Sequence, residues 1–182
     1  DLHDPFLMQD MQKAIDRIEE AIVKGENILV YGDYDVDGTT ATSMMYMYLL
    51  EFGCKAHYYI PHRFKEGYGI SEDGIDYAKS IGATLIVSVD CGITAVPEVI
   101  QANSLGIDVI ICDHHQPKEE LPPAYAILDP IQPNCKYPFK FLSGAGVAFK
   151  LARAVCDKIG QSEKVLKHLD LVALAAAADI VP

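Results

Sequence analysis

The sequence predicts an α/β fold in which a mostly parallel sheet is flanked by helices and followed by a helical C-terminal segment. Two observations predict it. Over residues 1–143, short strands that are apolar throughout alternate with helix-like stretches, a pattern typical of parallel sheets that are covered on both faces. From about Gly144 onward the apolar residues recur at helical spacing, which predicts two helices and no further strand.

The N-terminal part begins with a helix. Apolar residues recur at helical spacing over residues 11–22, and Gly25 follows as a stop. A short apolar strand is expected over residues 27–31, then an aspartate-rich loop and a helix over residues 39–52. A second strand is expected over residues 54–60.

The alternation continues along the middle of the chain. Residues 71–81 form a predicted helix, entered through a serine cap with acidic residues in its first turn. Residues 84–89 are a continuous apolar strand, residues 97–105 a helix with proline at its start, and residues 108–112 a further strand. A last, weaker strand is expected over residues 125–128, within a long proline-rich connection.

The composition is that of a globular protein. Half of the 182 residues are hydrophobic and 23% are charged, and the longest apolar stretch, residues 172–178, is too short to span a bilayer, so no membrane partner is expected. The net charge is −11, whereas proteins that grip the nucleic-acid backbone usually have a basic surface. A nucleic-acid role would therefore need metal ions, a local basic patch or another domain.

The cysteines and the chain ends indicate the redox environment of the protein and whether the chain is a fragment. The five cysteines, at positions 54, 91, 112, 135 and 156, include no CxxC pair, which argues against a disulfide framework or a thiolate zinc site and favours a reducing, cytoplasmic setting. Because the chain starts at Asp1 without an initiator Met and stops just after an apolar run, we expect a fragment of a longer protein.

Three aspartates follow the first predicted strand at alternate positions: Asp33, Asp35 and Asp37. In an extended segment alternate side chains point the same way, so these carboxylates would repel one another unless cations lay among them. Hard divalent cations prefer such oxygen ligands. The alternative is a solvated acidic turn, since Asp and Gly are ordinary turn residues.

Two further polar clusters follow predicted strands. Asp90 comes after the strand at residues 84–89, and Asp113, His114 and His115 come after the next one. Ligand sites in open α/β sheets form outside the carboxyl ends of the strands, so we expect all these side chains at one edge. Carboxylates with one or two imidazoles suit Mn²⁺ or Mg²⁺ better than structural zinc. Their number predicts two ions about 4 Å apart, an arrangement that hydrolyses phosphate esters.

Three motifs, GDYDVDG, VDCG and CDHH, resemble those of the DHH phosphoesterase superfamily, and most closely the RecJ family of single-strand-specific 5′-to-3′ DNA exonucleases. Further matches are PHRFKEGYG, YPF, SGAGVAFK and ADIVP, at residues 61–69, 137–139, 143–150 and 178–182. The resemblance covers nearly the whole chain, from residue 2 onward. It implies that residues 1–182 are a DHH catalytic lobe, with an α/β sheet portion at 1–143 and a helical portion at 144–182.

The resemblance also implies roles for the site residues. His115 would face the scissile phosphate or hold the site's hydrogen bonds, Asp113 would orient a histidine, and Asp90 would bridge both ions. Asp33 would be a ligand or orient water. The full set of implied metal ligands is Asp33, Asp35, Asp37, Asp90, His114 and Asp179. One position departs from the pattern, because some relatives carry histidine where Tyr31 stands, and this leaves open whether one ion has a complete protein shell.

Two segments are candidates for substrate binding. His62, Arg63 and Lys65 form the only compact basic group near a predicted strand end. We expect Arg63 in particular to contact DNA phosphate, and the alternative is an ordinary exposed charge cluster. Gly144 and Gly146 open a predicted helix, where free N–H groups could hold a phosphate or the glycines could serve close packing.

Three functions are compatible with these features. The first is hydrolysis of single-stranded DNA from the 5′ end, by a lobe that the resemblance pairs with C-terminal substrate-binding and oligonucleotide-binding domains outside this chain. The second is hydrolysis of a small substrate, such as an oligoribonucleotide, a cyclic dinucleotide or pyrophosphate. The third is a non-catalytic replication scaffold, and the presence of every expected ligand argues against it.

Overall fold

A computed structural model of the protein describes residues 3–181, so Leu2, where the resemblance begins, and Pro182, the last residue of the ADIVP motif, lie outside the described residues. The strands form one five-stranded sheet in the order β2-β1-β3-β4-β5, and every neighbouring pair is parallel. The strands are β1 (Asn27–Gly32), β2 (Lys55–Tyr59), β3 (Ala83–Val89), β4 (Asp108–Cys112) and β5 (Ala126–Leu128). The predicted α/β fold with a parallel sheet is confirmed.

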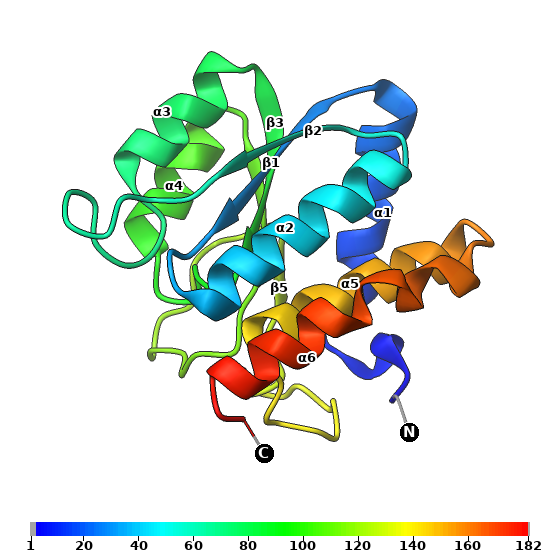
Figure 1. Ribbon diagram of the computed structural model, residues 1–182. Coiled ribbons are helices and arrows are strands. Elements are labelled where there is room, and N and C mark those ends of the chain that lie inside the picture. Colours follow the sequence, from blue (N-terminus) through cyan, green and yellow to red (C-terminus); the bar gives the residue numbers. More distant parts are fainter. Residues whose placement is uncertain (1–2, 182) are drawn as a thin grey trace.

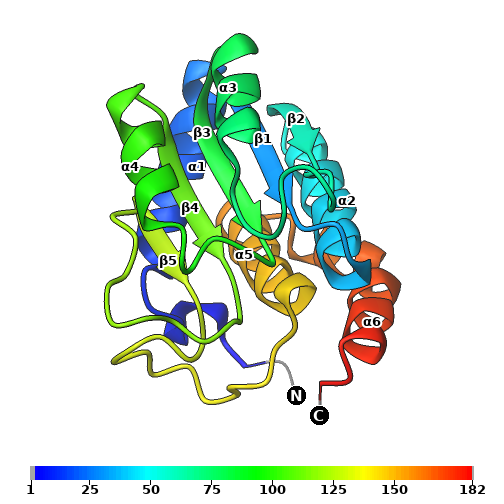
Figure 2. The same ribbon diagram turned by 90° about the vertical axis from the view of Figure 1, so that its left-hand side faces the viewer.

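Helices cover both faces of this sheet, as Figures 1 and 2 show. The helices are η1 (Pro5–Leu7), α1 (Met11–Lys24), α2 (Val36–Glu51), α3 (Glu72–Ser80), α4 (Val96–Ser104), α5 (Gly144–Lys158), η2 (Ser162–His168) and α6 (Leu169–Ala178). Within residues 3–181, no helix has the length and apolar character needed to cross a membrane.

The two faces bury alternate residues of each strand, as the period of a strand requires. Ile28 and Val30 of β1 pack with α1, α2 and α5 in the larger core, and Leu29 and Tyr31 pack with α3 and α4 in the smaller one. The helical C-terminal segment belongs to the larger core, where α5 and α6 both contact α2. This packing brings the end of α6 beside the start of α2.

The sequence placed most elements within a few residues of their observed bounds, but it misjudged the start of α2. This helix begins at Val36 and not at residue 39, because the carboxylate of Asp35 caps it by accepting a hydrogen bond from the amide of Gly38 at 2.8 Å. The expectation of one extended segment from Asp33 to Asp37 was therefore wrong, since Asp37 already lies in the first helical turn.

The N-terminal edge of the sheet is closed by ion pairs. Arg17 of α1 is only 5% exposed, and its guanidinium donates to Asp108 at 2.6 Å and to Glu26 at 2.8 Å. Thr84 also donates to Glu26. These bonds tie α1 to the starts of three strands and satisfy the buried charge. The buried carboxylate oxygens without partners lie at the opposite edge of the sheet, among the described residues Asp33, Asp90 and Asp129.

Candidate metal centre

Each of four neighbouring strands is directly followed by an aspartate. Asp33, Asp90, Asp113 and Asp129 directly follow β1, β3, β4 and β5, and each is at most 3% exposed. Because burying a carboxylate without partners is costly, this edge of the sheet must supply hydrogen bonds or cations. Sequence reasoning missed Asp129, whose only signal is its place after a three-residue strand. One of its oxygens has no hydrogen-bond partner, and burial raises its pKa to about 7.

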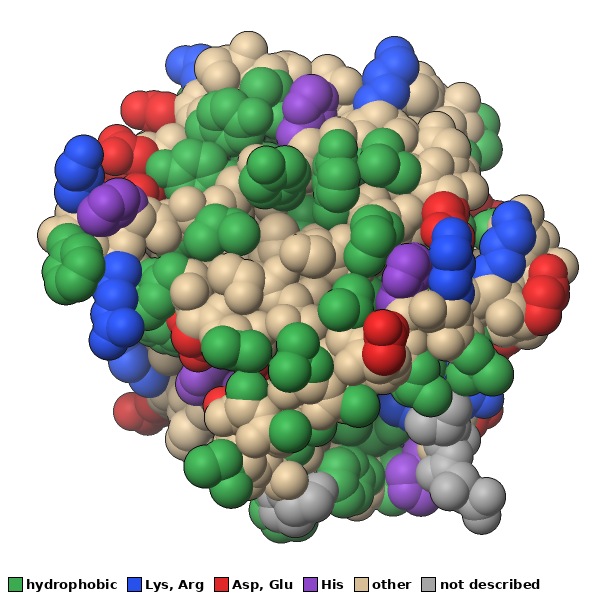
Figure 3. Space-filling model, viewed as in Figure 1, with side chains coloured by type: hydrophobic (Ala, Val, Ile, Leu, Met, Phe, Trp, Pro, Cys, Tyr) green, Lys and Arg blue, Asp and Glu red, His purple; other side chains and the backbone are tan. Residues whose placement is uncertain are grey.

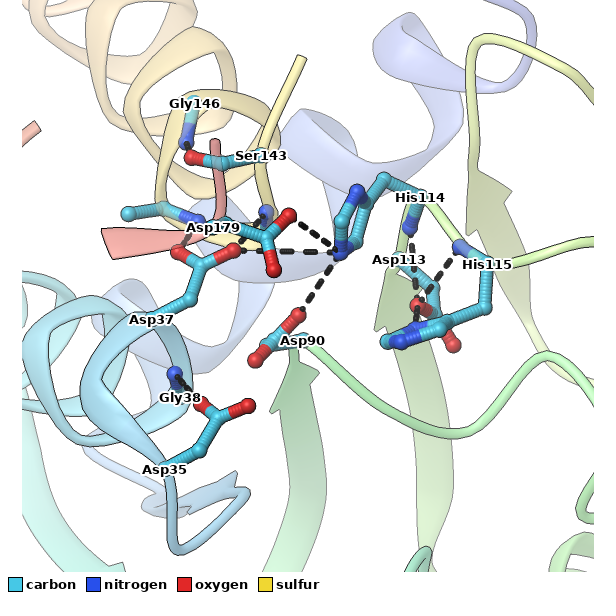
Figure 4. A network of polar contacts seen from close by, with 12 residues as sticks. Asp35, Asp37, Gly38, Asp90, Asp113, His114, His115, Ser143, Gly146 and Asp179 are labelled. Atoms are coloured by element: carbon cyan, nitrogen blue, oxygen red, sulfur yellow. Dashed lines mark hydrogen bonds and ion pairs between the residues drawn. The ribbon is translucent and has the colours of Figure 1, made fainter. Parts of the chain in front are cut away.

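The imidazole of His114 lies at the centre of the site (Figure 4). Its Nε2 atom is 3.1 Å from an oxygen of Asp90, 3.7 Å from one of Asp179 and 3.8 Å from one of Asp37. Burial alone would lower the pKa of His114, but Asp90 and Asp37 outweigh it and raise that pKa to about 9. The structure thus gathers carboxylates from the end of β3, the start of α2 and the end of α6 around one ring nitrogen.

Asp90 has the most exceptional environment of these carboxylates. It is 1% exposed, its backbone φ is 61°, and neither side-chain oxygen has a partner that meets hydrogen-bond geometry. The contact with His114 at 3.1 Å is a charge contact and not an aligned hydrogen bond. Burial raises the pKa of Asp90 to about 7. Unsatisfied buried oxygens call for a missing partner, and a divalent cation is one that an oxygen-rich site accommodates.

The start of α5 holds Asp37. The amide of Gly144 donates to one oxygen of Asp37 at 2.6 Å, and the amide of Ala145 donates to the other at 2.8 Å. A Cβ atom on Gly144 would lie 2.4 Å from the Cβ of Asp90, so only glycine allows this close approach. The amide of Gly146 donates to Ser143 at 3.2 Å. These amides are already bonded, and the geometry favours the packing alternative over phosphate binding for Gly144 and Gly146.

A second group of oxygens lies on the other side of Asp90. Asp33, Asp35 and Asp90 each offer an oxygen within 4.8 Å of the others. One oxygen of Asp33 has no partner, and burial raises the pKa of Asp33. The alternate aspartates therefore divide between two groups, with Asp37 beside His114 and the other two here. Asp90 touches both groups, and the donors fit two hard cations.

Both carboxylate oxygens of Asp113 accept hydrogen bonds, and one of these bonds comes from the ring of His115. One of its oxygens accepts hydrogen bonds from Nδ1 of His115 at 2.7 Å and from the amides of His114 and His115. The other oxygen accepts from the amide of Ile93 at 2.9 Å. Burial alone would raise the pKa of Asp113, but these bonds lower it, and Asp113 in turn raises the pKa of His115. The ring of His115 is fixed, and one of its nitrogens lies within 4.8 Å of ligand atoms of Asp90 and His114.

Tyr31 packs away from the metal groups. Its hydroxyl donates to the carbonyl of Gly69 at 2.9 Å and accepts from the amide of Ser71 at 3.0 Å. A Cβ atom added to Gly74 would lie 2.3 Å from Cε2 of the Tyr31 ring, so the ring packs directly against this glycine of α3. Tyr31 is thus a packing partner of α3, and its hydroxyl is engaged by the backbone of Gly69 and Ser71.

The predicted basic group lies on the exposed loop that joins β2 to α3. The guanidinium of Arg63 stacks 5.2 Å from the ring centroid of Tyr34, the residue between Asp33 and Asp35. Arg63 is therefore at the rim of the site. Neither His62 nor Lys65 has such a contact with the aspartate loop in the part of the chain that the structure describes.

Known proteins resemble this chain in sequence. The model of the DHH family, N-terminal domain, matches residues 27–176. The single-stranded-DNA-specific exonuclease RecJ of Bacillus subtilis (strain 168) is 50% identical over 100% of this chain and 22% of its own length. RecJ of Escherichia coli (strain K12) is 39% identical over 96% of this chain and 32% of its own length. The chain thus spans between about a fifth and a third of these two relatives.

Solved structures match the fold as well. A crystal structure of exonuclease RecJ bound to manganese superposes with a TM-score of 0.86 at 35% identity, covering 96% of this chain and 44% of that one. RecJ from Thermus thermophilus in complex with Mn²⁺ gives a TM-score of 0.79 at 31% identity, over 96% of this chain and 25% of that one.

Proposed function

This chain belongs to the DHH family, and we propose that it is the catalytic lobe of a two-metal phosphodiesterase that hydrolyses single-stranded DNA from the 5′ end. The observation that carries the proposal is the ring nitrogen of His114 lying within 3.8 Å of carboxylate oxygens from Asp37, Asp90 and Asp179. The likeness to exonucleases named as single-strand-specific supports the choice of substrate.

We assign the ligands from the two groups of oxygens. Asp37, Asp90, His114 and Asp179 would hold one ion, and Asp33, Asp35 and Asp90 the other, so Asp90 would bridge them. Mn²⁺ or Mg²⁺ fits this mixture of carboxylates and one imidazole. Because Tyr31 offers nothing to the second group, that ion would keep water in its remaining positions.

The ions and the neighbouring His115 and Asp113 would have different roles in the reaction. When bound, the ions supply Lewis-acid stabilisation of the phosphate and lower the pKa of a water. His115, fixed by Asp113 through Nδ1 at 2.7 Å, would present its other nitrogen to the scissile phosphate. Asp113 raises the pKa of His115, which favours the protonated ring that can hydrogen-bond a phosphate oxygen or protonate the leaving oxygen.

The rest of the binding surface would come from several parts. Arg63 at the rim would contact a DNA phosphate, with His62 and Lys65 as weaker contributors. The chain itself is acidic, with a net charge of −11, so a C-terminal substrate-binding domain and an oligonucleotide-binding domain of the same protein would provide most of the affinity for DNA. Within this chain we propose an α/β portion at residues 1–143 and a helical portion at 144–182, and a cytoplasmic location.

The test is a metal titration joined to product analysis on the full-length protein. Calorimetry after EDTA treatment should find two Mn²⁺ ions per chain. With Mn²⁺, an oligonucleotide labelled at its 5′ end should release a labelled mononucleotide first, and a blunt duplex should resist. Absence of tight Mn²⁺ binding would favour a scaffold, and faster turnover of a dinucleotide than of the oligonucleotide would favour the small-substrate alternative.

A further inference from the structure

The loop at residues 61–69, between β2 and α3, has a defined conformation. The carboxylate of Glu66 stabilises this conformation. One of its oxygens accepts a hydrogen bond from the amide of His62 at 2.7 Å. The other accepts from the hydroxyls of Tyr59 at 2.8 Å and Ser71 at 2.6 Å. The amides of Lys65 and Glu66 both donate to the carbonyl of His62 at 2.9 Å. The half-buried carboxylate of Glu66 therefore joins the loop to the end of β2 and to the start of α3.

Two contacts place this loop at the entrance of the metal centre. At one end Arg63 stacks on Tyr34, between two of the candidate ligands. At the other end the hydroxyl of Tyr68 lies 2.9 Å from Nδ1 of His115. In the space-filling view, Lys and Arg side chains lie at the left edge of the molecule, where the loop projects, with acidic side chains above and below them (Figure 3). The loop therefore lies beside the aspartate loop and the ring of His115.

Phe64 lies in this loop and is 89% exposed, the highest value among the large hydrophobic side chains that the structure describes. Its one aromatic neighbour is the ring of His62, with centroids 6.2 Å apart and planes tilted by 56°. Neither core includes it. A single exposed apolar residue is ordinary, but this one lies on a hydrogen-bonded loop between the cations Arg63 and Lys65, in a chain whose net charge is −11.

We propose that the ring of Phe64 is a stacking platform for a nucleobase of the substrate strand, beside the phosphate that Arg63 contacts. The inference rests on the proposed function and deepens it. An aromatic face next to backbone-binding cations is the usual means of holding single-stranded nucleic acid without reading its sequence. In the interior of a duplex, neighbouring base pairs cover both faces of each base, so the platform accepts an internal base only from an unpaired strand. Phe64 is thereby a specificity-determining residue for single strands.

The experiment compares Phe64→Ala, Phe64→Trp and the unsubstituted full-length protein on single-stranded oligonucleotides with Mn²⁺. Removing one base–aromatic stack costs about 1–3 kcal/mol, so kcat/KM for Phe64→Ala should fall by about 5- to 150-fold, while Phe64→Trp stays near the unsubstituted value. The matched control is Phe6→Ala, which removes another exposed phenyl ring, 44% exposed, on η1 at the opposite side of the molecule.

Abasic substrates distinguish stacking from a general effect of the loop. Oligonucleotides with one abasic site, placed in turn at each of the first few positions from the 5′ end, should include one that the unsubstituted protein cleaves as poorly as Phe64→Ala cleaves the intact strand. On that substrate Phe64→Ala should lose nothing further. Equal losses for both proteins at every position, or a normal kcat/KM for Phe64→Ala, would overturn the platform.

A failure of the platform can be told apart from a failure of the proposed function. Mn²⁺ binding measured by calorimetry should be the same for Phe64→Ala and the unsubstituted protein, because the Phe64 side chain is 89% exposed and is not a candidate ligand. Mn²⁺-dependent cleavage by the unsubstituted protein, with no effect of Phe64→Ala, removes the platform alone. No cleavage by either protein removes the proposed function and the platform with it.

Discussion

The carboxylate of Asp37 accepts a hydrogen bond of 2.6 Å from the amide of Gly144, 107 residues further along the chain. This bond joins the first turns of α2 and α5. An anion at a helix N-terminus is stabilised by the free amides and the helix dipole, and here that stabilisation fixes the direction of a candidate metal ligand. The same turn lies against Asp90, so one glycine positions two carboxylates.

Gly144→Ala should therefore damage the metal centre more than the helix. The added methyl group would lie 2.4 Å from Asp90, and such overpacking costs about 1–3 kcal/mol. Displaced ligands should weaken Mn²⁺ binding by at least the roughly 10- to 100-fold that loss of a supporting contact costs. Gly146→Ala is the control, because its methyl group would meet the Leu142 side chain at 3.3 Å and the Ser143 hydroxyl at 3.6 Å, and neither is a candidate ligand. Calorimetry that finds equal Mn²⁺ affinities for both variants would contradict this account.

Asp90→Asn should abolish hydrolysis and leave the fold intact. Asn is the suitable replacement because Asp90 has a φ of 61°, and Asn tolerates the left-handed region. Losing a ligand common to both ions should lower kcat by more than about 10³-fold, the upper range for removing one charge-stabilising group. Circular dichroism should be unchanged, and the exposed Asp73→Asn should behave as the unsubstituted protein. Near-normal turnover by Asp90→Asn would refute the two-ion scheme.

The metal-free protein should lose stability as pH rises. Burial raises the pKa of Asp90 from 3.8 to about 7, so the stability present below about pH 4 is lost as this carboxyl ionises in the folded state, by an upper limit of about 4 kcal/mol. Asp90 and Asp37, against the opposing effect of burial, raise the pKa of His114 from 6.5 to about 9, and its contribution is lost as pH rises through that value.

Mn²⁺ should reverse this trend, because the ions replace the protons and bind the deprotonated ligands best. The increase in melting temperature on adding Mn²⁺ should grow between about pH 5.5 and pH 9. Melting curves with EDTA and with Mn²⁺ measure both effects, and Asp90→Asn provides the comparison. A Mn²⁺-induced increase that is constant across this range would contradict proton–metal competition at the site.

Asp113→Asn should act through His115. Asp113 is the main cause of the raised pKa of His115, so the variant should shift the alkaline limb of the kcat profile to lower pH and reduce kcat by about 10²- to 10⁴-fold, the contribution of a positioned acid or base. Asp108→Asn removes another aspartate partner, at Arg17. It should lower stability without moving the profile. An unshifted limb in Asp113→Asn would exclude the proton role of His115.

Arg63→Ala should weaken DNA binding without affecting the metals. If the Arg63 guanidinium at the rim contacts one phosphate, its loss should reduce affinity about equally for all sequences and lower the salt dependence of binding by about one unit. Arg63→Lys should recover part of the affinity but not the stacking on Tyr34. Fluorescence anisotropy over a range of salt concentrations measures this slope, and an unchanged slope would place Arg63 outside the DNA path.

A feature of this structure could be predicted from the sequence when it depends on neighbouring residues, and not when it depends on contacts between distant segments. Strand and helix periodicities are local, so the parallel sheet and its helices could be placed from residue patterns. The gathering of Asp90 and His114 could also be expected, because parallel strands end at one edge. The bonds from the start of α5 to Asp37 could not, since they depend on how two distant helices pack.

Three other features could not be predicted, for similar reasons. Asp35 reads equally well as a ligand in an extended loop or as a helix cap, and only the observed bond to Gly38 shows that the helix begins at Val36. Asp129 follows a strand of three residues, too short for a periodic pattern to stand out. The contact between Tyr68 and His115 joins a loop and a strand end that no local pattern connects.

The candidate ligands are spread from Asp33 to Asp179, and this has a consequence for biosynthesis. A ribosome produces the first carboxylates long before the last, so a nascent or prematurely terminated polypeptide carries part of the set without the means to close it. Under the proposed assignment, the ligand group around His114 would be complete only after α6 has been translated and docked, because Asp179 directly follows that helix.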